Sequence, residues 1–200
     1  ITGDNLIRDY SGFENNGDII WSGSPDVKKD SSGLLFGKDC FVEVPNSESL
    51  DVMGLTITMM GWVYPTKEEH GLVDVITKGD NHVLQVSDGR TLSFFAGGWG
   101  RGECEVALPG NWIQHWHHIA GVCTGKKLSL YIAGILRGNT MLDDTVKLSH
   151  FNSWNLGRNQ EFPSERIFNG YMKLVKIFEA PLTQKEIDSI IEKEKAFINE

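Results

Sequence analysis

Short apolar runs separated by turn residues dominate positions 34–178. Within 128–132, apolar residues recur at every second position, which is the period of a β-strand with one buried face. The turn 124–127 joins this run to another apolar run before it, and Asp88-Gly89 joins two further runs within 83–95. An Asp-Gly pair between alternating apolar runs is a strong signal for a β-hairpin. The pattern therefore predicts antiparallel strands linked by tight turns.

The run from Leu55 to Tyr64 is apolar on both of its alternating faces. Ile57 and Met59 fall on one face, and Met60 and Trp62 fall on the other. A strand of this kind is covered on both sides, as in a sandwich of two sheets. Trp154 alternates with Leu156 and is expected to be buried as well.

The pattern changes to a helical period at the end of the chain. Thr183 followed by Glu186 is a capping box, and Leu182 can pack against Ile187 across it. Ile187, Ile190, Ile191 and Ile198 then follow helical spacing. The sequence predicts one short amphipathic C-terminal helix packed on the sandwich.

Several motifs, taken in order along the chain, resemble those of laminin G-like domains in the concanavalin A-like lectin/glucanase superfamily. They are Asp9-Tyr10-Ser11-Gly12 with Gly17, Leu35-Phe36-Gly37 through Pro45, Ile57 through Pro65, Trp116 through Ala120 with Leu128 through Gly134, Leu156-Gly157 with Phe168-Asn169-Gly170 and Leu174 through Phe178, and Pro181-Leu182-Thr183 with Glu186-Ile187. The chain departs from the family at Ala133 and Lys173, where Asp is frequent, so no function of those carboxylates carries over.

The resemblance implies an all-β, concanavalin A-like jelly-roll sandwich of two antiparallel sheets with a short C-terminal helix, formed as a single domain over 1–200. It also implies non-catalytic binding of a glycan or polysaccharide by a lectin-like or accessory module of a secreted or cell-surface protein. The alternative is a protein-interaction, adhesion or spacer module without sugar binding. A chain that begins at Ile1 is expected to be a mature form or part of a larger multidomain protein.

The net charge and the cysteine content narrow these choices. The formal net charge is −8, with 27 acidic and 19 basic residues, which argues against nucleic acid and anionic membrane surfaces as partners. No apolar run approaches the roughly 20 residues that span a bilayer, so membrane insertion is not expected.

Three cysteines, Cys40, Cys104 and Cys123, leave at least one thiol unpaired. A Cys104–Cys123 disulfide and simple packing of the thiols both remain open.

The candidate sugar-binding residues lie in loops. Sugars stack their apolar faces on aromatic rings and need planar polar groups to orient their hydroxyls. Trp99 and Arg101 share a glycine-rich segment, 96–102, that offers this combination. Alternatively, Trp99 folds back over one end of the sandwich. Arg158, Asn159 and His82 are further candidates.

Structural calcium is a second possibility that the resemblance raises. Calcium prefers oxygen ligands, and Asp and Asn residues crowd the first 18 positions: Asp4, Asn5, Asp9, Asn15, Asn16 and Asp18. Asp9 is the best single candidate ligand and Asn16 a second one. The alternative is that these residues only form turns.

Glycoside hydrolysis is the third possible function of a protein with this fold. Glycosidases hold two carboxyl groups about 5–10 Å apart across the scissile bond. The glucanases of the superfamily carry them in an E-x-D-x-E or E-x-D-x-x-E strand, which is absent from the sequence. Glu103 and Glu105 are the nearest approach, on one face of a predicted strand. The sequence therefore predicts a protein that is not an enzyme.

Overall fold

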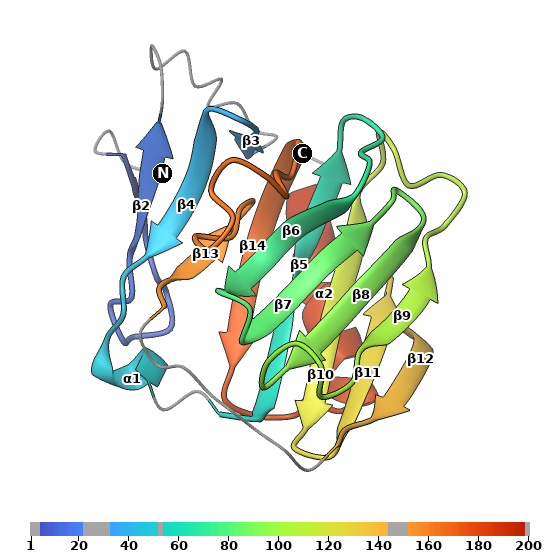
Figure 1. The fold of residues 1–200 in the computed structure, drawn as a ribbon. Helices are drawn as coiled ribbons and strands as arrows, with labels where there is room; N and C mark the ends of the chain where they lie inside the picture. Colours follow the sequence, from blue (N-terminus) through green and yellow to red (C-terminus); the bar gives the residue numbers. More distant parts are fainter. Residues whose placement is uncertain (1–4, 22–32, 52–53, 144–151, 199–200) are drawn as a thin grey trace.

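Two antiparallel β-sheets pack face to face in the computed structural model, which describes residues 5–21, 33–51, 54–143 and 152–198 (Figure 1). The eight-stranded sheet has the order β1 (Leu6–Ile7), β2 (Gly17–Trp21), β4 (Cys40–Val44), β13 (Trp154–Leu156), β6 (Leu72–Lys78), β7 (His82–Ser87), β8 (Thr91–Ala96) and β9 (Cys104–Ala107). The six-stranded sheet has the order β12 (Ile135–Met141), β11 (Lys127–Ile132), β10 (His117–Thr124), β5 (Thr56–Pro65), β14 (Gly170–Phe178) and β3 (Leu34–Phe36). Two helices, α1 (Glu48–Asp51) and α2 (Gln184–Ile198), complete the described elements. The predicted all-β sandwich with a short C-terminal helix is confirmed.

The two predicted hairpins form as expected. β7 and β8 meet at Asp88 and Gly89, whose φ angles are 48° and 62°. Such left-handed angles suit a tight turn between twisted strands and are easily reached by Gly. β10 and β11 meet at Gly125, which also has a positive φ.

The central strand β5 is buried on both faces, as its sequence predicts. Ile57 and Met59 point into the core between the two sheets, whereas Met60 and Trp62 pack under α2. The second face of β5 is therefore covered by a helix and not by a third layer of strands. Trp62 and Trp154 are buried, but Trp116 is only partly buried, beside Tyr64. Its strand begins one residue later, at His117, so Trp116 lies at the edge of the covered area.

The start of α2 is the predicted capping box. The Thr183 backbone N–H donates to Glu186 Oε2 at 2.7 Å, and the Glu186 N–H donates to Thr183 Oγ1 at 3.4 Å. Ile187, Ile191 and Ile198 are buried against the six-stranded sheet. The helix therefore covers the outer side of that sheet, and the eight-stranded sheet forms the opposite side of the sandwich (Figure 1). Within the described residues, no helix is long and apolar enough to cross a bilayer.

The three cysteines are buried and none forms a disulfide, so the pairing left open by the sequence does not occur. Cys104 and Cys123 both belong to the core between the sheets. Burial raises the pKa of the Cys40 thiol to about 12, against the attraction of the nearby Arg158 guanidinium. These residues therefore act as small apolar side chains in the core.

Candidate ligand-binding site

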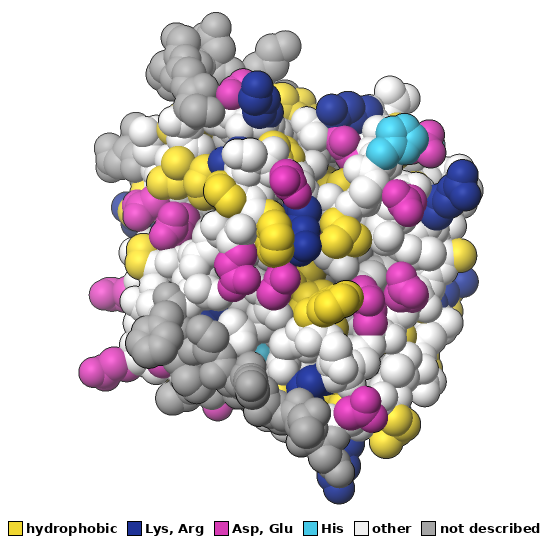
Figure 2. Space-filling view, viewed as in Figure 1, with side chains coloured by type: hydrophobic (Ala, Val, Ile, Leu, Met, Phe, Trp, Pro, Cys, Tyr) yellow, Lys and Arg dark blue, Asp and Glu magenta, His cyan; other side chains and the backbone are white. Residues whose placement is uncertain are grey.

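The face of the eight-stranded sheet that points away from the six-stranded sheet is here called the outer face. Strand pairing places Asp74, Gln85, Ser93 and Glu105 side by side across β6, β7, β8 and β9. Their neighbours along the strands, such as Phe94, point into the core, because Phe94 contacts the backbone of the opposite sheet at Gly121. In Figure 2, acidic side chains surround a basic one that is flanked by apolar side chains near the middle of this face.

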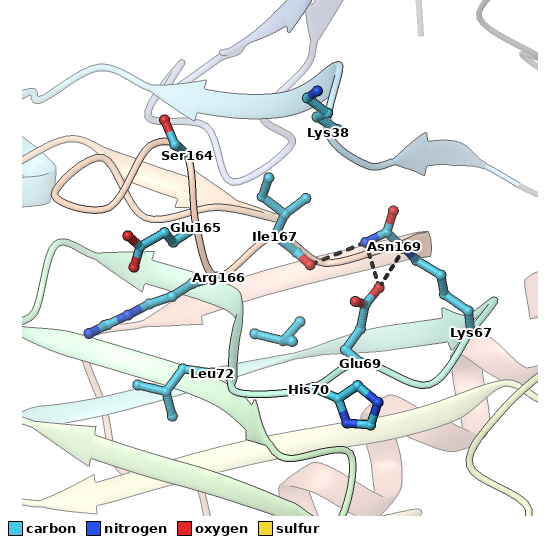
Figure 3. Close-up of a pocket in the computed structure, with 11 residues that line it drawn as sticks. Lys38, Lys67, Glu69, His70, Leu72, Ser164, Glu165, Arg166, Ile167 and Asn169 are labelled. Carbon is cyan, nitrogen blue, oxygen red and sulfur yellow. Dashed lines mark hydrogen bonds and ion pairs between the residues drawn. The ribbon is translucent and has the colours of Figure 1, made fainter.

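A hollow of about 280 Å³ opens at one edge of the outer face. It is lined by residues of β6 and of the loops around it, including Glu69, Leu72, Arg166 and Asn169 (Figure 3). Asn169 Nδ2 donates to Glu69 Oε1 at 2.5 Å, and Lys67 lies 3.4 Å from the same carboxylate. The wall of this hollow is therefore built from polar groups that already hold one another in place.

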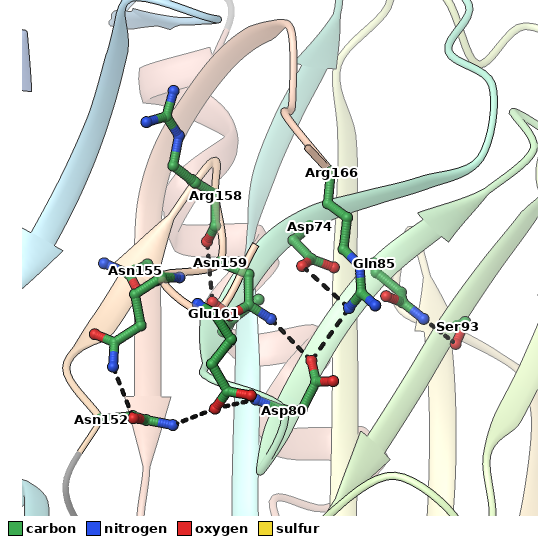
Figure 4. A network of polar contacts seen from close by, with 12 residues as sticks. Asp74, Asp80, Gln85, Ser93, Asn152, Asn155, Arg158, Asn159, Glu161 and Arg166 are labelled. Atoms are coloured by element: carbon green, nitrogen blue, oxygen red, sulfur yellow. Dashed lines mark hydrogen bonds and ion pairs between the residues drawn. The ribbon is translucent and has the colours of Figure 1, made fainter. Parts of the chain in front are cut away.

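Arg166 extends from this hollow across the outer face. Its Nη1 lies 3.1 Å from Asp80 Oδ1 and 3.8 Å from Asp74 Oδ2 (Figure 4). The ring of Phe162 covers the guanidinium at 3.5 Å. A hydrogen bond between backbone groups holds Arg166 in position: the Asp74 N–H donates to the Arg166 carbonyl oxygen at 2.8 Å. The loop 157–169 therefore lies beside β6 and positions the Phe162 ring and the Arg166 guanidinium over the sheet.

Asp74 is completely buried beneath this arginine. Burial raises the pKa of the carboxyl group to about 7, whereas the Arg166 charge and the Asn159 amide act in the opposite direction. The cause is desolvation, since a carboxylate loses its hydration when it is covered. The arginine therefore compensates a buried charge as well as forming part of the surface.

Asp80, in the turn between β6 and β7, is the meeting point of the polar network. Its Oδ1 accepts hydrogen bonds from Arg166 and, at 2.9 Å, from Asn159 Nδ2. The Asp80 backbone N–H donates to Glu161 Oε1 at 3.3 Å, and Asn152 donates to the same oxygen (Figure 4). These bonds fix the positions of two acidic side chains at the border of the outer face.

Glu103 lies across the middle of the same face, beside β8. Its Oε1 accepts hydrogen bonds from Ser93 Oγ and, at 3.3 Å, from Gln85 Nε2. Ser93 and Gln85 are buried, but Glu103 is only half-buried. Two buried donors therefore hold a carboxylate that still reaches solvent, an arrangement suited to accept a hydrogen bond from a ligand hydroxyl.

Trp99 projects from the loop between β8 and β9, and 77% of its surface is exposed. The backbone N–H groups of Gly97 and Gly98 both donate to the Asn81 carbonyl oxygen, at 2.7 and 3.0 Å. The loop is therefore tied to the β6–β7 turn that carries Asp80. The alternative in which Trp99 folds back over the sandwich does not occur, and the indole is open to solvent.

Arg101 does not have the predicted geometry. It is 5% exposed and its guanidinium points inward, donating to the carbonyl oxygens of Ala96 at 3.3 Å and Asp143 at 2.8 Å. Gly97, with a φ of 88°, leaves room for it, because a Cβ there would lie 2.5 Å from Arg101 Nη1. Arg101 therefore holds the loop from within and does not face a ligand beside Trp99.

The other predicted ligand residues are also largely covered. His82 is buried and stacks on Trp154 with a distance of 5.8 Å between ring centres, so it belongs to the interior. Asn159 is buried and holds Asp80. Arg158 lies on the Phe41 ring at 4.4 Å and donates to the Lys38 carbonyl oxygen at 2.7 Å. These side chains support the outer face, and only Trp99 among the predicted ligand residues is widely open.

The sequence contains a local signal for part of the site that side-chain alternation alone does not reveal. Asp74, Gln85 and Ser93 each interrupt an otherwise apolar strand. Polar residues inside buried strands need partners, so such positions indicate a polar network on one face. Arg166 carries no comparable local signal, because its partner Asp74 is distant in the chain.

The two candidate calcium ligands, Asp9 and Asn16, are engaged in hydrogen bonds within their own loop. Asp9 Oδ1 accepts from the Ser11 N–H at 2.8 Å, and Oδ2 accepts from Ser11 Oγ at 2.6 Å and from the Asn15 N–H at 3.0 Å. Asn16 Oδ1 accepts from the Asp9 N–H at 3.0 Å. Burial raises the pKa of Asp9, but these donors outweigh it and lower the pKa below its usual value. The described residues contain no cluster of three or more acidic, histidine or cysteine side chains arranged for a metal, and Asp4 lies outside them.

The fold and this exposed face define a lectin-like β-sandwich. Residues 36–188 match a laminin G-like family described as the concanavalin A-like lectin/glucanases superfamily. The match covers most of the chain, which therefore belongs to this family. A comparison with curated proteins found no significant match.

Solved structures with the same fold include binding domains of larger proteins. Domain 4 of AbnA, a GH43 extracellular arabinanase from Geobacillus stearothermophilus, in complex with arabinotriose, has a TM-score of 0.59 at 16% identity, covering 88% of this chain and 87% of that one. The receptor-binding domain of the botulinum neurotoxin C/D mosaic serotype has a TM-score of 0.68 at 16% identity, covering 94% and 48%. The botulinum neurotoxin DC binding domain in complex with SialylT has a TM-score of 0.59 at 11% identity, covering 94% and 44%. The chain thus spans about half the length of these neurotoxin domains, and the likeness shows the fold alone.

Proposed function

We propose that this protein binds carbohydrate without catalysis, on the outer face of the eight-stranded sheet. The observation that carries the proposal is the open indole of Trp99 at the rim of a face lined by ordered polar side chains. An indole offers a flat apolar surface to the C–H face of a sugar, and carboxylates such as Glu103 accept hydrogen bonds from its hydroxyls. The bound arabinotriose and SialylT of two similar folds support the same reading.

The proposal includes the setting of the protein. The similar structures are domains of larger proteins, and one of these proteins is an extracellular enzyme. We therefore propose that this chain serves as a lectin-like or accessory module of a secreted or cell-surface protein. Its acidic character is consistent with a ligand other than nucleic acid.

The direct test is a glycan array followed by titration of the best glycan with a Trp99→Ala variant. Loss of one aromatic stacking contact is worth about 1–3 kcal/mol in nucleic-acid systems, so affinity is expected to fall about 5- to 150-fold. The melting temperature is expected to stay the same because the indole makes little contact with the core. The control is Phe197→Ala, which removes a ring that is 59% exposed on α2, on the opposite side of the sandwich.

Unchanged affinity in the Trp99→Ala variant would move the binding site elsewhere. Absence of any glycan ligand would instead favour the alternative of a protein-interaction, adhesion or spacer module. Both results are informative because the Phe197→Ala control separates a specific loss from a general effect of removing an exposed ring.

We also propose that the protein has no glycosidase activity. Glu105 pairs across the sheet with Ser93, and Glu103 is bound to the same serine, so both carboxylates lie on the outer face. The carboxylate of Glu103 is engaged by its two donors, and the paired-carboxylate strand of the glucanases is absent from the sequence. Incubation with polysaccharides should release no reducing sugar. Turnover that Glu103→Gln or Glu105→Gln abolishes would contradict this.

A further inference from the structure

Among the described residues, the polar groups that the outer face presents to solvent are mainly hydrogen-bond acceptors with negative charge. Glu103 and Glu105 lie beside β8 and β9, while Asp80 and Glu161 lie at the β6–β7 turn. Figure 2 shows acidic side chains spread over this side of the molecule. A ligand lying across β6 to β9 therefore meets several carboxylates.

Arg166 and Arg158, which lie on this face, do not offset this charge for a ligand. Arg166 contacts the carboxylates of both Asp74 and Asp80, and one side of its guanidinium is covered by Phe162. Arg158 rests on Phe41 and donates to a backbone carbonyl. The Arg166 guanidinium therefore offers no free planar fork that could bind a carboxylate in a bidentate manner. Arg158 offers only part of one, because its Nη2 is bound to the Lys38 carbonyl and its Nε is buried.

The basic side chains near the hollow are similarly limited. Lys67 is 3.4 Å from Glu69, and Glu165 lines the same hollow as Lys38 and Arg166 (Figure 3). In the part of the chain that the structure describes, Lys38, Lys67 and Arg166 line the hollow against Glu69 and Glu165, which is an excess of one positive charge. Arg166 is also paired with Asp74 and Asp80, so this excess is small beside the carboxylates of Glu103, Glu105 and Glu161 over the rest of the outer face.

From this charge distribution, and resting on the proposed function, we infer that the ligand is a neutral, hydroxyl-rich glycan and that sugars bearing carboxylate or sulfate groups are rejected. Hydroxyl groups can donate to Glu103 and Glu105, whereas an anionic substituent meets like charge. Each nearby charge acts through solvent, so the discrimination arises from several modest repulsions that add up.

The test compares matched glycans that differ by one acidic sugar. An array that contains neutral, sialylated, sulfated and uronic acid-bearing members identifies the best class. Pairs such as lactose with sialyllactose, or xylo-oligosaccharides with their glucuronic acid-substituted forms, are then titrated. We expect the neutral member of the bound pair to bind about tenfold tighter at low salt, and the difference to shrink in concentrated salt, which screens charge repulsion.

Charge-neutral variants identify the groups responsible. The double variant Glu103→Gln/Glu105→Gln is expected to reduce the preference for the neutral member to about threefold or less. The control is Glu192→Gln on α2, an exposed carboxylate on the other side of the sandwich, and it should leave the preference unchanged.

Equal or tighter binding of the acidic member, or a preference that salt and the double variant leave unchanged, would overturn this inference and leave the proposed function standing. Binding of no glycan on the array would reject the proposed function itself, together with the inference that rests on it.

Discussion

At the scale of single residues, two buried titratable side chains have opposite effects on stability. Asp74 is fully buried and desolvation raises its pKa to about 7. His118 is also fully buried, under α2 beside Trp62, and desolvation together with the Lys176 charge lowers its pKa to about 4. Both groups favour the uncharged form in the folded protein, but one gains its charge as the pH rises and the other as the pH falls.

The two effects oppose each other between pH 4 and pH 7. Below pH 7 the folded state keeps the proton on Asp74 that the unfolded chain loses near its usual pKa of 3.8, so this group destabilises the fold as the pH rises. The unfolded chain protonates His118 near 6.5 while the folded state does not, so this group stabilises the fold as the pH rises. Each effect is on the order of 3 kcal/mol.

Substitution of either residue should therefore expose the effect of the other. In Asp74→Asn, the free energy of unfolding should rise with pH from 4 to 7. In His118→Phe, it should fall relative to the unmodified protein over the same range, so that the profile of the unmodified protein lies between those of the two variants. Urea unfolding at several pH values measures this. Parallel pH profiles for the three proteins would show that neither group titrates as its burial requires.

At the scale of elements, α2 was predictable because its signals are local. The capping box, the isoleucine spacing and the leucine before the helix all lie within one short segment.

The sequence predicted the position of the loop 97–103 but not the direction of its side chains. Its glycines indicate a turn and leave Trp99 without packing partners, but nothing local determines that Arg101 points inward to Asp143.

The capping interaction gives a prediction at this scale. Thr183→Ala removes the side-chain acceptor of the first turn and should lower the free energy of unfolding by about 1 kcal/mol. Ser189→Ala removes a hydroxyl from an exposed position inside the same helix and should leave stability unchanged or slightly raised. Chemical unfolding of both variants provides the comparison. Equal effects would show that the cap does not stabilise the helix.

At the scale of the whole molecule, α2 packs on the six-stranded sheet, on the side away from the outer face of the eight-stranded sheet. The β1–β2 loop lies at one edge of this sheet and is closed by hydrogen bonds to Asp9 and by contacts of Asn15 with Ser47 and Ser49. Hydrogen bonds of its own side chains therefore hold the loop against the rest of the protein. In other proteins a bound calcium ion often holds a loop in this way.

Removal of divalent ions tests this directly. Because the Asp9 carboxylate already accepts three hydrogen bonds, we expect EDTA to leave the melting temperature unchanged. Asp9→Ala should destabilise the protein by about 1 kcal/mol both with and without EDTA, since the loss is one of internal bonds. A melting temperature that EDTA lowers and added calcium restores would show that the ion binds the folded state.

The sequence by itself determined the strands, their turns, the two-sided burial of β5 and the C-terminal helix. These features follow from side-chain alternation and from capping and turn residues, all of which act over a few neighbouring positions. It also placed Trp99 in a loop between glycines, but it left open whether the indole faces solvent or folds back over the sandwich.

Only the tertiary structure decided which polar groups share a surface. Asp74, Asp80, Glu103 and Arg166 come from separate strands and loops, and they meet because the sheet order brings β6, β7 and β8 together beside the returning loop 157–169. The tertiary structure also decided the burial of Arg101, which binds the carbonyl oxygen of the distant residue Asp143. The direction of a loop side chain depends on which groups from distant parts of the chain lie within hydrogen-bonding distance. The spacing of apolar residues along the sequence gives no information about those groups.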